Sequence, residues 1–383
     1  MTPSGKPRWL GTRVSSELRP VLGARLRAQH LIGPPAPGVA DAVHDALAMQ
    51  SQDPPLARFS IALRTGLSHD DEVVQQLGSG EVLRTHVLRP TWHYVHRDDV
   101  RWLLRLTGPK IISGTASRHR QLGIDDQVRD EAFSCIQRAL SDGQTLTRKQ
   151  LHPLLPVTGF ARQGQVVGHL LFLAEMDALI ASGPSREGEQ TYRLMDEIVP
   201  EDTPLPSDEA AVHLVQRFVA GRGPSSVHDI QRWCVLAKGQ ITTALRDSDL
   251  AHGHVEGVEL WWPADAPPRG DCRGTWLLPM YDEAYGCHDE TRFPRPAGHR
   301  MGHTHVEGAG AGHGVIIVDG RDIGRFVLTG SARAKKLDLE LAPRISTTTR
   351  AKTVAPARRL AAFTGAQKVT TSVTGVPAGA ETA

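Results

Sequence analysis

DQVRDEAFSCIQRALS, residues 126–141, carries apolar residues at helical spacing and opens the segment from which the fold class follows. Thr145-Leu146-Thr147 then supplies capping residues for a second helix, RKQLHPLL (148–155). A strongly apolar third helix is expected at QVVGHLLFLAEMDALI (165–180). It is followed by SGPSREGEQTYRLM (182–195), a polar, glycine-rich tip between two short extended pieces. The order helix, helix, helix, hairpin is typical of a winged helix-turn-helix module.

The same order recurs on both sides of this segment. The downstream copy has expected helices at 207–221, 227–237 and 238–249 and a hairpin at 252–263. The front copy is looser, with helices at 38–50, 54–65 and 69–80 and a hairpin at 81–95. Because this order is also common in unrelated folds, the repeat rests on the agreement of lengths and caps in two copies. We therefore predict an α+β protein with three tandem winged-helix modules.

The chain beyond residue 270 is rich in β-forming residues, as in TWLLPMYDEAY (275–285), GVIIVDGRDIGRFVLTG (314–330) and LDLELAP (337–343). Val318-Asp319-Gly320-Arg321 is expected to form a tight turn because Asp-Gly tolerates positive φ. The pattern predicts a small antiparallel sheet or β-barrel at the C-terminal end.

The predicted organisation has five parts. Residues 1–120 form the first winged-helix module, 121–203 the second and 204–268 the third. Residues 269–365 form the C-terminal sheet or barrel, with a Gly/His-rich insertion at 287–314 and a last helix at 354–365. Residues 366–383 are small and polar, so we expect a disordered tail.

The composition is that of an ordinary folded protein, with 383 residues, 40% hydrophobic and 22% charged. It excludes collagen, coiled coils and wholesale disorder, and the length predicts two or three domains. The four cysteines lie far apart without a Cys-x-x-Cys pair, which argues against a disulfide framework or a cysteine zinc site. Without a signal-peptide core or a run of about 20 apolar residues, we expect a cytoplasmic protein, located at the nucleoid and without membrane contact.

Basic charge is concentrated in two regions, although the net charge is only +2. Residues 81–120 hold eight Lys/Arg against three acids, and residues 321–369 hold eleven against three. Solvated surface charge would explain such an excess equally well. Combined with winged-helix modules, it favours a nucleic-acid backbone as the partner.

The sharpest local motif is QSQDPP, residues 50–55. The first helix is expected to run through Ala46–Met49 and to stop near the Asp53-Pro54-Pro55 break, where Gln50 and Gln52 could face one cleft. The nearby hairpin would add amide, imidazole and guanidinium neighbours from Arg84, His86, Arg89, Thr91, Trp92 and His93. From spacing alone, a capping role is the more probable alternative, with the two glutamines at a helix end and Asp53 capping the next helix.

The sequence resembles the AlkZ/YcaQ-type winged-helix DNA glycosylase family, on its AlkZ-like branch, over residues 10–365. Seven segments carry the resemblance in family order: ALAMQSQDPP, LRTHVLRPTWHYV, GHLLFLAEMDALIASGP, TYRLMDEIVP, GRGPSSVHDIQRW, LLPMYDEAY and VIIVDGRDIG. The resemblance implies tandem winged helices and a C-terminal β-barrel, wrapped into a C-shaped architecture around double-stranded DNA.

The resemblance also implies the site. Gln50 and Gln52 match the Gln-x-Gln form of the family's catalytic motif, and Ser51 stands where the YcaQ-like branch usually has an apolar residue. The expected substrates are alkylated purines in duplex DNA, including bulky adducts and interstrand crosslinks, in repair or self-resistance. The hairpin residues would lie in a groove near the lesion, and Arg118 and Arg120 are expected to contact phosphates.

Two amides can suffice for this chemistry because a purine alkylated at N7 is already cationic, and its departure neutralises it. The site then needs mainly to hold a water beneath C1′ and to solvate developing charge. No lysine stands in the motif to form a Schiff base, so we expect a monofunctional glycosylase without cofactor. The histidines of the Gly/His-rich region (His288, His299, His303, His305 and His313) fit no closed metal site.

Two other readings remain. A non-catalytic winged-helix regulator or damage sensor would not need the glutamine pair and is expected to be dimeric, whereas the enzyme is expected to be a monomer. A structural nucleoid protein is disfavoured by the near-zero net charge. The resemblance implies that Tyr281-Asp282-Glu283, inside a predicted β-element, is a fold signature of the family.

Overall fold

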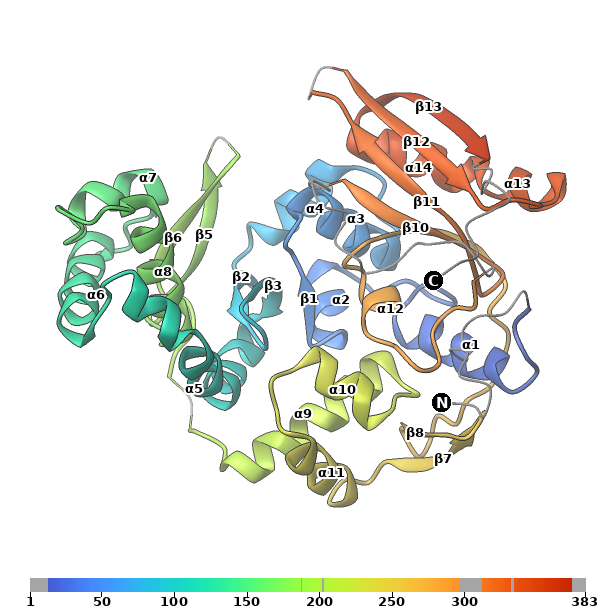
Figure 1. Cartoon of the computed structure of the whole chain (residues 1–383), viewed down its shortest axis with the longest axis horizontal. Coiled ribbons are helices and arrows are strands. Elements are labelled where there is room, and N and C mark those ends of the chain that lie inside the picture. The colour runs from blue at the N-terminus through green and yellow to red at the C-terminus, as the bar shows by residue number, and fades with distance from the viewer. Residues whose placement is uncertain (1–12, 187, 202, 296–311, 332–333, 374–383) are drawn as a thin grey trace, which may run out of the picture.

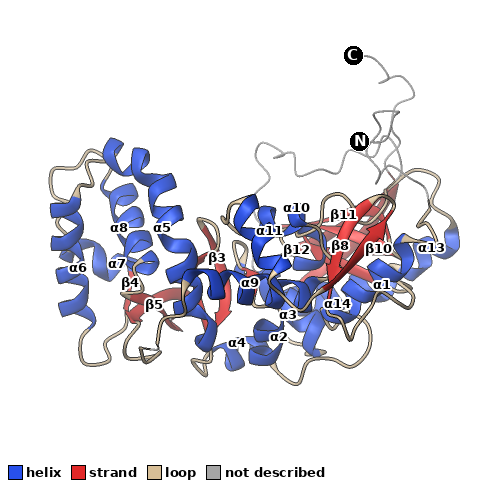
Figure 2. Ribbon diagram, turned by 90° about the horizontal axis from the view of Figure 1, so that it is seen from below, coloured by secondary structure: helices blue, strands red, loops and turns tan. Residues whose placement is uncertain are grey.

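The computed structural model describes residues 13–186, 188–201, 203–295, 312–331 and 334–373. They form a mixed α+β molecule whose elements follow a curved path (Figure 1). The segment predicted as the second module lies at one end and the C-terminal sheet at the other, in both ribbon views (Figure 2). None of the helices in these ranges is long and apolar enough to cross a membrane.

The elements of the front segment are α1 (Leu18–Ala28), α2 (Val39–Asp45), β1 (Ala48–Gln50), α3 (Pro54–Thr65), α4 (Asp70–Leu77), β2 (Val82–Val87) and β3 (Thr91–His96). From α2 onward the front segment has the predicted order of three helices and a hairpin, and it also contains a helix, α1, and a short strand, β1, that were not predicted. The three strands form an antiparallel sheet in the order β1-β3-β2.

The prediction that the first helix runs on through Ala46–Met49 is wrong. α2 ends at Asp45, Leu47 adopts a left-handed φ of 60°, and Ala48–Gln50 pair with β3. A short apolar run fits a helix or a strand equally well, so local pattern could not separate them. Here the pairing with β3 determines that the run forms a strand.

The second and third segments also follow the predicted order. The long helix α5 (Arg97–Gln121) leads into α6 (Asp126–Leu140), β4 (Leu146–Thr147), α7 (Arg148–Leu151), the 3₁₀ turn η1 (His152–Leu154), α8 (Gln163–Met176), β5 (Ile180–Arg186) and β6 (Glu189–Leu194). Thr147 caps α7 as predicted, with its side chain accepting from the Gln150 nitrogen. The third segment contains α9 (Ser207–Arg222), α10 (Val227–Trp233), α11 (Lys238–Arg246), β7 (Ala251–Val255) and β8 (Val258–Trp262). Their classification as winged-helix modules stays a prediction.

The C-terminal part is a five-stranded sheet in the order β13-β12-β11-β10-β9. Its elements are β9 (Thr275–Pro279), α12 (Glu283–Gly286), β10 (His313–Val318), β11 (Arg321–Thr329), β12 (Lys335–Leu341), α13 (Thr347–Lys352), α14 (Val354–Thr364) and β13 (Ala366–Val373). The tight turn predicted at Val318–Arg321 is present, with Asp319 at φ 49° and Gly320 at φ 75°.

The prediction of a disordered tail over residues 366–383 is wrong for its first half. Ala366–Val373 form β13, which pairs in parallel with the edge strand β12. The sequence KVTTSV is rich in β-branched residues, a strand signal that its small, polar composition hid. Residues 374–383 lie outside the described residues.

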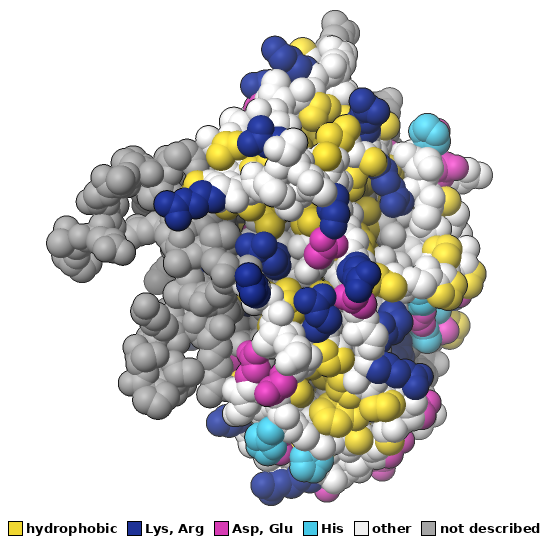
Figure 3. Space-filling model, turned by 90° about the vertical axis from the view of Figure 1, so that its right-hand side faces the viewer, with side chains coloured by type: hydrophobic (Ala, Val, Ile, Leu, Met, Phe, Trp, Pro, Cys, Tyr) yellow, Lys and Arg dark blue, Asp and Glu magenta, His cyan; other side chains and the backbone are white. Residues whose placement is uncertain are grey.

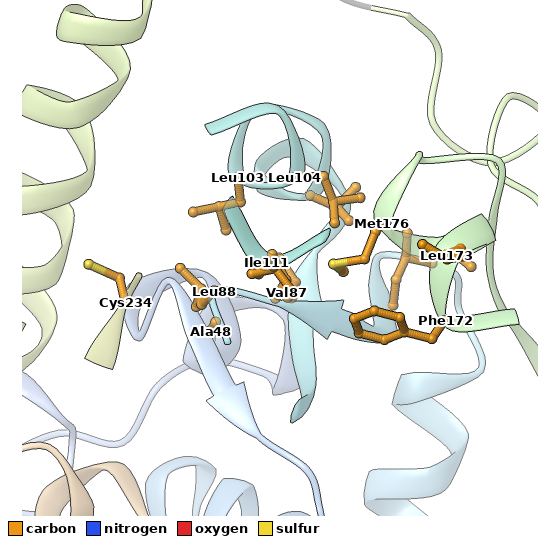
Figure 4. Packing of buried hydrophobic residues seen from close by; sticks show 14 of the residues in the cluster. Ala48, Val87, Leu88, Leu103, Leu104, Ile111, Phe172, Leu173, Met176 and Cys234 are labelled. Atoms are coloured by element: carbon orange, nitrogen blue, oxygen red, sulfur yellow. The ribbon is translucent and has the colours of Figure 1, made fainter. Parts of the chain in front are cut away.

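The hydrophobic cores cross the predicted domain boundaries, which themselves stay predictions. One cluster packs β1 and the β2–β3 hairpin against α5 and α8, and Val87, Leu88, Leu103, Ile111 and Phe172 are among its members (Figure 4). A second joins α2 and α3 of the front segment to the C-terminal sheet and α14. The front sheet is therefore clamped on two sides, which gives its strands a fixed position.

Candidate active site

Gln50 and Gln52 flank the point where the chain leaves β1. Gln50 ends the strand opposite His93, and the Ser51 backbone nitrogen donates to the Trp92 carbonyl at 2.7 Å. Ser51 is buried, Gln50 is half-buried and Gln52 is exposed. The alternative in which the two glutamines cap a helix end does not hold, because α2 ends at Asp45.

The turn end of the β2–β3 hairpin holds both amide oxygens. Arg89 Nη2 donates to Gln50 Oε1 at 3.1 Å, and the Trp92 backbone nitrogen donates to Gln52 Oε1 at 3.4 Å. A carbonyl oxygen has two lone pairs, so each amide keeps an acceptor position. The structure thus brings the predicted glutamines together with the predicted hairpin.

A buried carboxylate fixes the backbone of Gln50. Glu283 Oε1 accepts from the Gln50 backbone nitrogen at 2.8 Å, while Oε2 accepts from Arg222 Nη2 at 2.8 Å and from Trp233 Nε1 at 3.0 Å. Burial opposes ionisation of Glu283, but the Arg222 charge, a hydrogen bond from the Cys287 thiol and the bond from the Gln50 backbone nitrogen outweigh it and lower the pKa to about 2. Arg222 is itself fully buried and also donates to the Ala46 and Ala48 carbonyls.

Sequence reasoning missed this carboxylate–guanidinium centre. Asp282 and Glu283 had been interpreted as a fold signature, and they are buried in ion pairs with Arg64 and Arg222. They follow β9 rather than lying in a strand, because Asp282 caps α12. The sequence could not reveal the link between Glu283 and Gln50, because only the fold brings these two residues together.

Asp53 stands next to Gln52, but its carboxylate has structural tasks. It caps α3, as one alternative predicted, with Oδ1 accepting from the Leu56 nitrogen at 3.5 Å. Its Oδ2 accepts from the Gly312 nitrogen at 2.7 Å. Both oxygens face backbone donors, so Asp53 ties the motif to the start of β10.

His93 lies buried behind the motif and is neutral. Burial first, and then repulsion by Arg89, lowers its pKa to about 3. Its Nδ1 contacts the Thr91 carbonyl at 2.9 Å, and its Nε2 has no hydrogen-bond partner among the described residues. The Thr91 hydroxyl likewise has none within the same part of the chain. The His93 ring and the Thr91 hydroxyl are both buried, and a role of either residue in DNA binding stays a prediction.

Arg84, His86 and Trp92 form a stack that joins the front sheet to the second segment. The Arg84 guanidinium lies 4.2 Å from the Trp92 ring centroid, and the His86 ring lies 4.0 Å from it. Arg84 Nη2 donates to the Ser51 carbonyl at 3.0 Å, and Nη1 donates to Gln190 of β6. His86 pairs with Glu175 of α8 and packs edge-on against Phe172. These side chains hold the motif against the neighbouring segment.

Arg118 and Arg120 lie apart from this group, on the last turn of α5. Arg118 donates to Gln121 at 3.1 Å and to Gln165 at 2.7 Å, and Arg120 is exposed. Binding of DNA by any of the predicted residues stays a prediction.

The histidines of the Gly/His-rich region do not assemble in the described residues. His288 is buried against Asp229, with burial lowering its pKa to about 4, and His313 begins β10. His299, His303 and His305 lie outside the described residues. Elsewhere, His44, His96 and Asp99 come within 4.8 Å of one another, but Arg217 holds the Asp99 carboxylate at 3.0 and 3.1 Å. A guanidinium at that position competes with a metal ion.

The four cysteines are all free, in agreement with the prediction of no disulfide framework. Cys287 is buried and donates to Glu283 Oε2 at 2.9 Å, and burial raises the pKa of its thiol. It is therefore a hydrogen-bond donor in the buried centre and not a thiolate nucleophile.

The fold and this site define an α+β protein in which a pair of neutral amides lies at the end of a clamped strand. The sequence matches the family "DNA glycosylase AlkZ-like" over residues 43–363, and the chain belongs to that family. The resemblance predicted from the seven segments is thereby confirmed.

Two individual proteins are similar to this chain. The interstrand DNA cross-link repair glycosylase of Streptomyces sahachiroi is 24% identical over 226 residues, which are 57% of this chain and 60% of that relative's length. The solved structure of DNA glycosylase AlkZ from Streptomyces sahachiroi superposes with a TM-score of 0.75 at 20% identity. That superposition covers 95% of this chain and 100% of the other, and it shows that the two share a fold.

Proposed function

We propose that this protein is a monofunctional DNA glycosylase that hydrolyses the N-glycosidic bond of purines alkylated at N7. The proposal includes bulky adducts and interstrand crosslinks as substrates, in keeping with the name of the curated relative. The observation that carries it is the pair Gln50 and Gln52, two uncharged amides whose oxygens are oriented by the hairpin.

An amide pair fits a leaving group that is already positively charged. When the glycosidic bond of an N7-alkylated purine breaks, the electron pair moves to the base and neutralises it, so no general acid is needed. The oxocarbenium-like sugar is then attacked at C1′ by a water, which must be held in place and which releases a proton to the solvent as the C1′–O bond forms. The remaining lone pair of Gln50 Oε1 can accept a hydrogen bond from that water. The amide NH₂ groups can donate to sugar or phosphate oxygens.

Arg89 gives the Gln50 amide its orientation. Arg89 donates to Gln50 Oε1 at 3.1 Å. Because Oε1 and the NH₂ group are both attached to Cδ, this bond also directs the NH₂ group away from Arg89. Arg89 Nη1 also donates to the Arg232 carbonyl at 3.3 Å, so α10 helps to hold the guanidinium. We assign Arg89 as a positioning residue rather than as a freely moving phosphate contact.

The neighbouring carboxylates do not provide a nucleophile. Asp53 accepts from two backbone nitrogens, and Glu283 is enclosed by Arg222, Trp233 and the Gln50 backbone. Without a free carboxylate or a lysine in the motif, direct hydrolysis by water is the mechanism that the side chains support.

The decisive experiment uses two duplexes, one with a single N7-methylguanine and one with an N7-linked interstrand crosslink. Alkali converts abasic sites into strand breaks, so base release is read on a denaturing gel. We expect breaks with the wild-type protein and a loss of about 100-fold or more in rate with Gln50→Ala/Gln52→Ala, since each amide stabilises charge only in the transition state.

A matched control replaces an exposed glutamine far from the motif, Gln137→Ala in α6. This control should release the base at the wild-type rate. If the double variant also releases base at the wild-type rate, the assignment of the two glutamines is wrong. Tight DNA binding by the wild type without any base release would favour the regulator or damage sensor.

A further inference from the structure

A second basic surface lies on the side of the molecule formed by α1, α13 and the β10–β11 turn, which shares no residue with the Gln50–Gln52 site. It surrounds a depression of about 500 Å³ lined by Arg13, Arg19, Arg273, Arg321, Lys352 and Asp319, with Val14 as its apolar member. Figure 3 faces this side and shows Lys and Arg side chains gathered over the middle of the view, with few acidic side chains among them. We call it the α1–α13 pocket.

Positive charge exceeds negative charge in the α1–α13 pocket. Among the described residues, two carboxylates form ion pairs with members of its group of five cationic side chains. Asp271 contacts both Arg19 at 3.1 Å and Arg273 at 2.6 Å, and Asp319 pairs with Lys352. Because each carboxylate carries a single charge, most of the positive charge on these five side chains has no balancing acid among the residues that the structure describes.

Part of the Arg321 guanidinium group is buried. Its Nε atom is buried and, within the described residues, has no hydrogen-bond partner. Burial first, and then repulsion by the nearby Arg13, lowers its pKa below the usual value of an arginine. Like charges that are held close together without an acid between them favour the binding of an anion.

The turn that carries Arg321 gives the pocket a fixed shape. Asp319 and Gly320 have positive φ, and β10 pairs with β11 directly across them, Val318 with Arg321. A side chain at position 320 would meet the Cys272 sulfur at 2.4 Å, so only glycine fits the close approach. Asp319 also accepts from the Gly274 nitrogen at 3.2 Å, which ties the turn to the segment that bears Arg273.

We propose that the α1–α13 pocket binds phosphate ester groups. Arginine donates through a planar fork that matches phosphate oxygens, and four arginines converge here from three separate parts of the chain. This inference rests on the proposed function, because the phosphates that we expect the pocket to bind are those of the duplex backbone beyond the lesion. The pocket would then extend the DNA footprint past the front sheet. A free phosphorylated compound presents the same chemistry.

The test compares the full chain with Arg13→Gln/Arg273→Gln, which removes two charges; the Arg273 side chain is 81% exposed. Affinity for an undamaged duplex is measured as a function of salt. Loss of two phosphate contacts should make the slope of log K against log salt shallower by about two and weaken binding by about tenfold at moderate salt. Arg129→Gln/Arg138→Gln on α6 removes the same charge at the other end of the molecule and should leave the slope unchanged.

Isothermal titration with inorganic pyrophosphate separates the two sources. Loss of binding to both pyrophosphate and duplex in the pocket variant assigns the pocket to DNA, whereas loss of pyrophosphate binding alone assigns it to a free phosphate ester. The proposal is overturned if both affinities match the wild type, or if the α6 control lowers the salt slope equally. Base release by the wild type is followed in parallel, so that a failure of the proposed glycosylase activity is recognised separately from a failure of the pocket.

Discussion

The Glu283 carboxylate accepts a hydrogen bond from the Gln50 backbone nitrogen at 2.8 Å, although 233 positions separate the two residues. The bond ties the first glutamine of the motif to the loop after β9. Since Glu283 is simultaneously held by Arg222 and Trp233, the third segment, the C-terminal part and the front sheet meet at this carboxylate. The position of the motif therefore depends on residues that are themselves buried.

Glu283→Gln should be strongly destabilising. The substitution keeps the shape but leaves Arg222 buried without its counter-ion, and breaking a buried pair in this way costs about 3–5 kcal/mol. Urea unfolding of the variant and the wild type at neutral pH measures the difference. A loss below about 1 kcal/mol would show that Arg222 finds another partner and that the pair is not the anchor described above.

Substitutions of Arg89 distinguish a positioning role from a phosphate contact. Arg89→Met removes the donor to Gln50 Oε1, and we expect base release at saturating protein to fall by about tenfold or more, since a misplaced group costs rate. The slope of DNA affinity against salt should stay as in the wild type. A shallower slope with an unchanged rate of release would instead make Arg89 a phosphate contact. Arg89→Lys keeps the charge and is the matched variant.

Arg84 was predicted from the sequence to contact DNA, and its contacts now favour a different expectation. Arg84→Gln should cost about 1–3 kcal/mol of stability, because it removes donors to Ser51 and Gln190 and the cation over the Trp92 ring. Its salt slope should equal that of the wild type, whereas Arg118→Gln should lower the slope by about one. The two variants are compared in one binding series.

His93 makes stability depend on acid. Its pKa is about 3 in the folded protein, while an exposed histidine titrates near 6.5. The neutral form is the folded form, so this contribution is complete above pH 6.5 and is lost as pH falls toward 3. Between pH 7 and pH 5 the loss should be about 2 kcal/mol.

His93→Asn isolates that contribution, because other buried groups titrate in the same range. Burial raises the pKa of Asp322 to about 7, for example, which makes folding less favourable as pH rises from 4 to 7. The quantity to compare is therefore the wild-type minus variant free energy of unfolding at pH 7 and at pH 5. An equal difference at the two pH values would mean that folding does not lower the pKa of His93.

Much of the fold could be predicted from local pattern. Helical spacing, caps such as Thr147 and Asp53, and the Asp319-Gly320 turn are short-range signals, and each element they predict is present. Errors arose where a neighbour in space decides between two local options. Ala48–Gln50 became a strand because β3 lies beside it, and Ala366–Val373 became a strand because β12 has an open edge.

Some features of the candidate site could likewise be predicted from local sequence, and others depend on the folded structure. The residue types and spacing of Gln50 and Gln52, the hairpin that follows them and the family are readable in the chain, because each is a contiguous stretch of sequence. The orientation of the amides by Arg89 and the anchoring of Gln50 by Glu283 and Arg222 exist only in the folded molecule. So does the burial that keeps His93 neutral. Hydrogen bonds and pKa shifts depend on distances between residues far apart in the sequence, and only packing of the complete chain sets those distances.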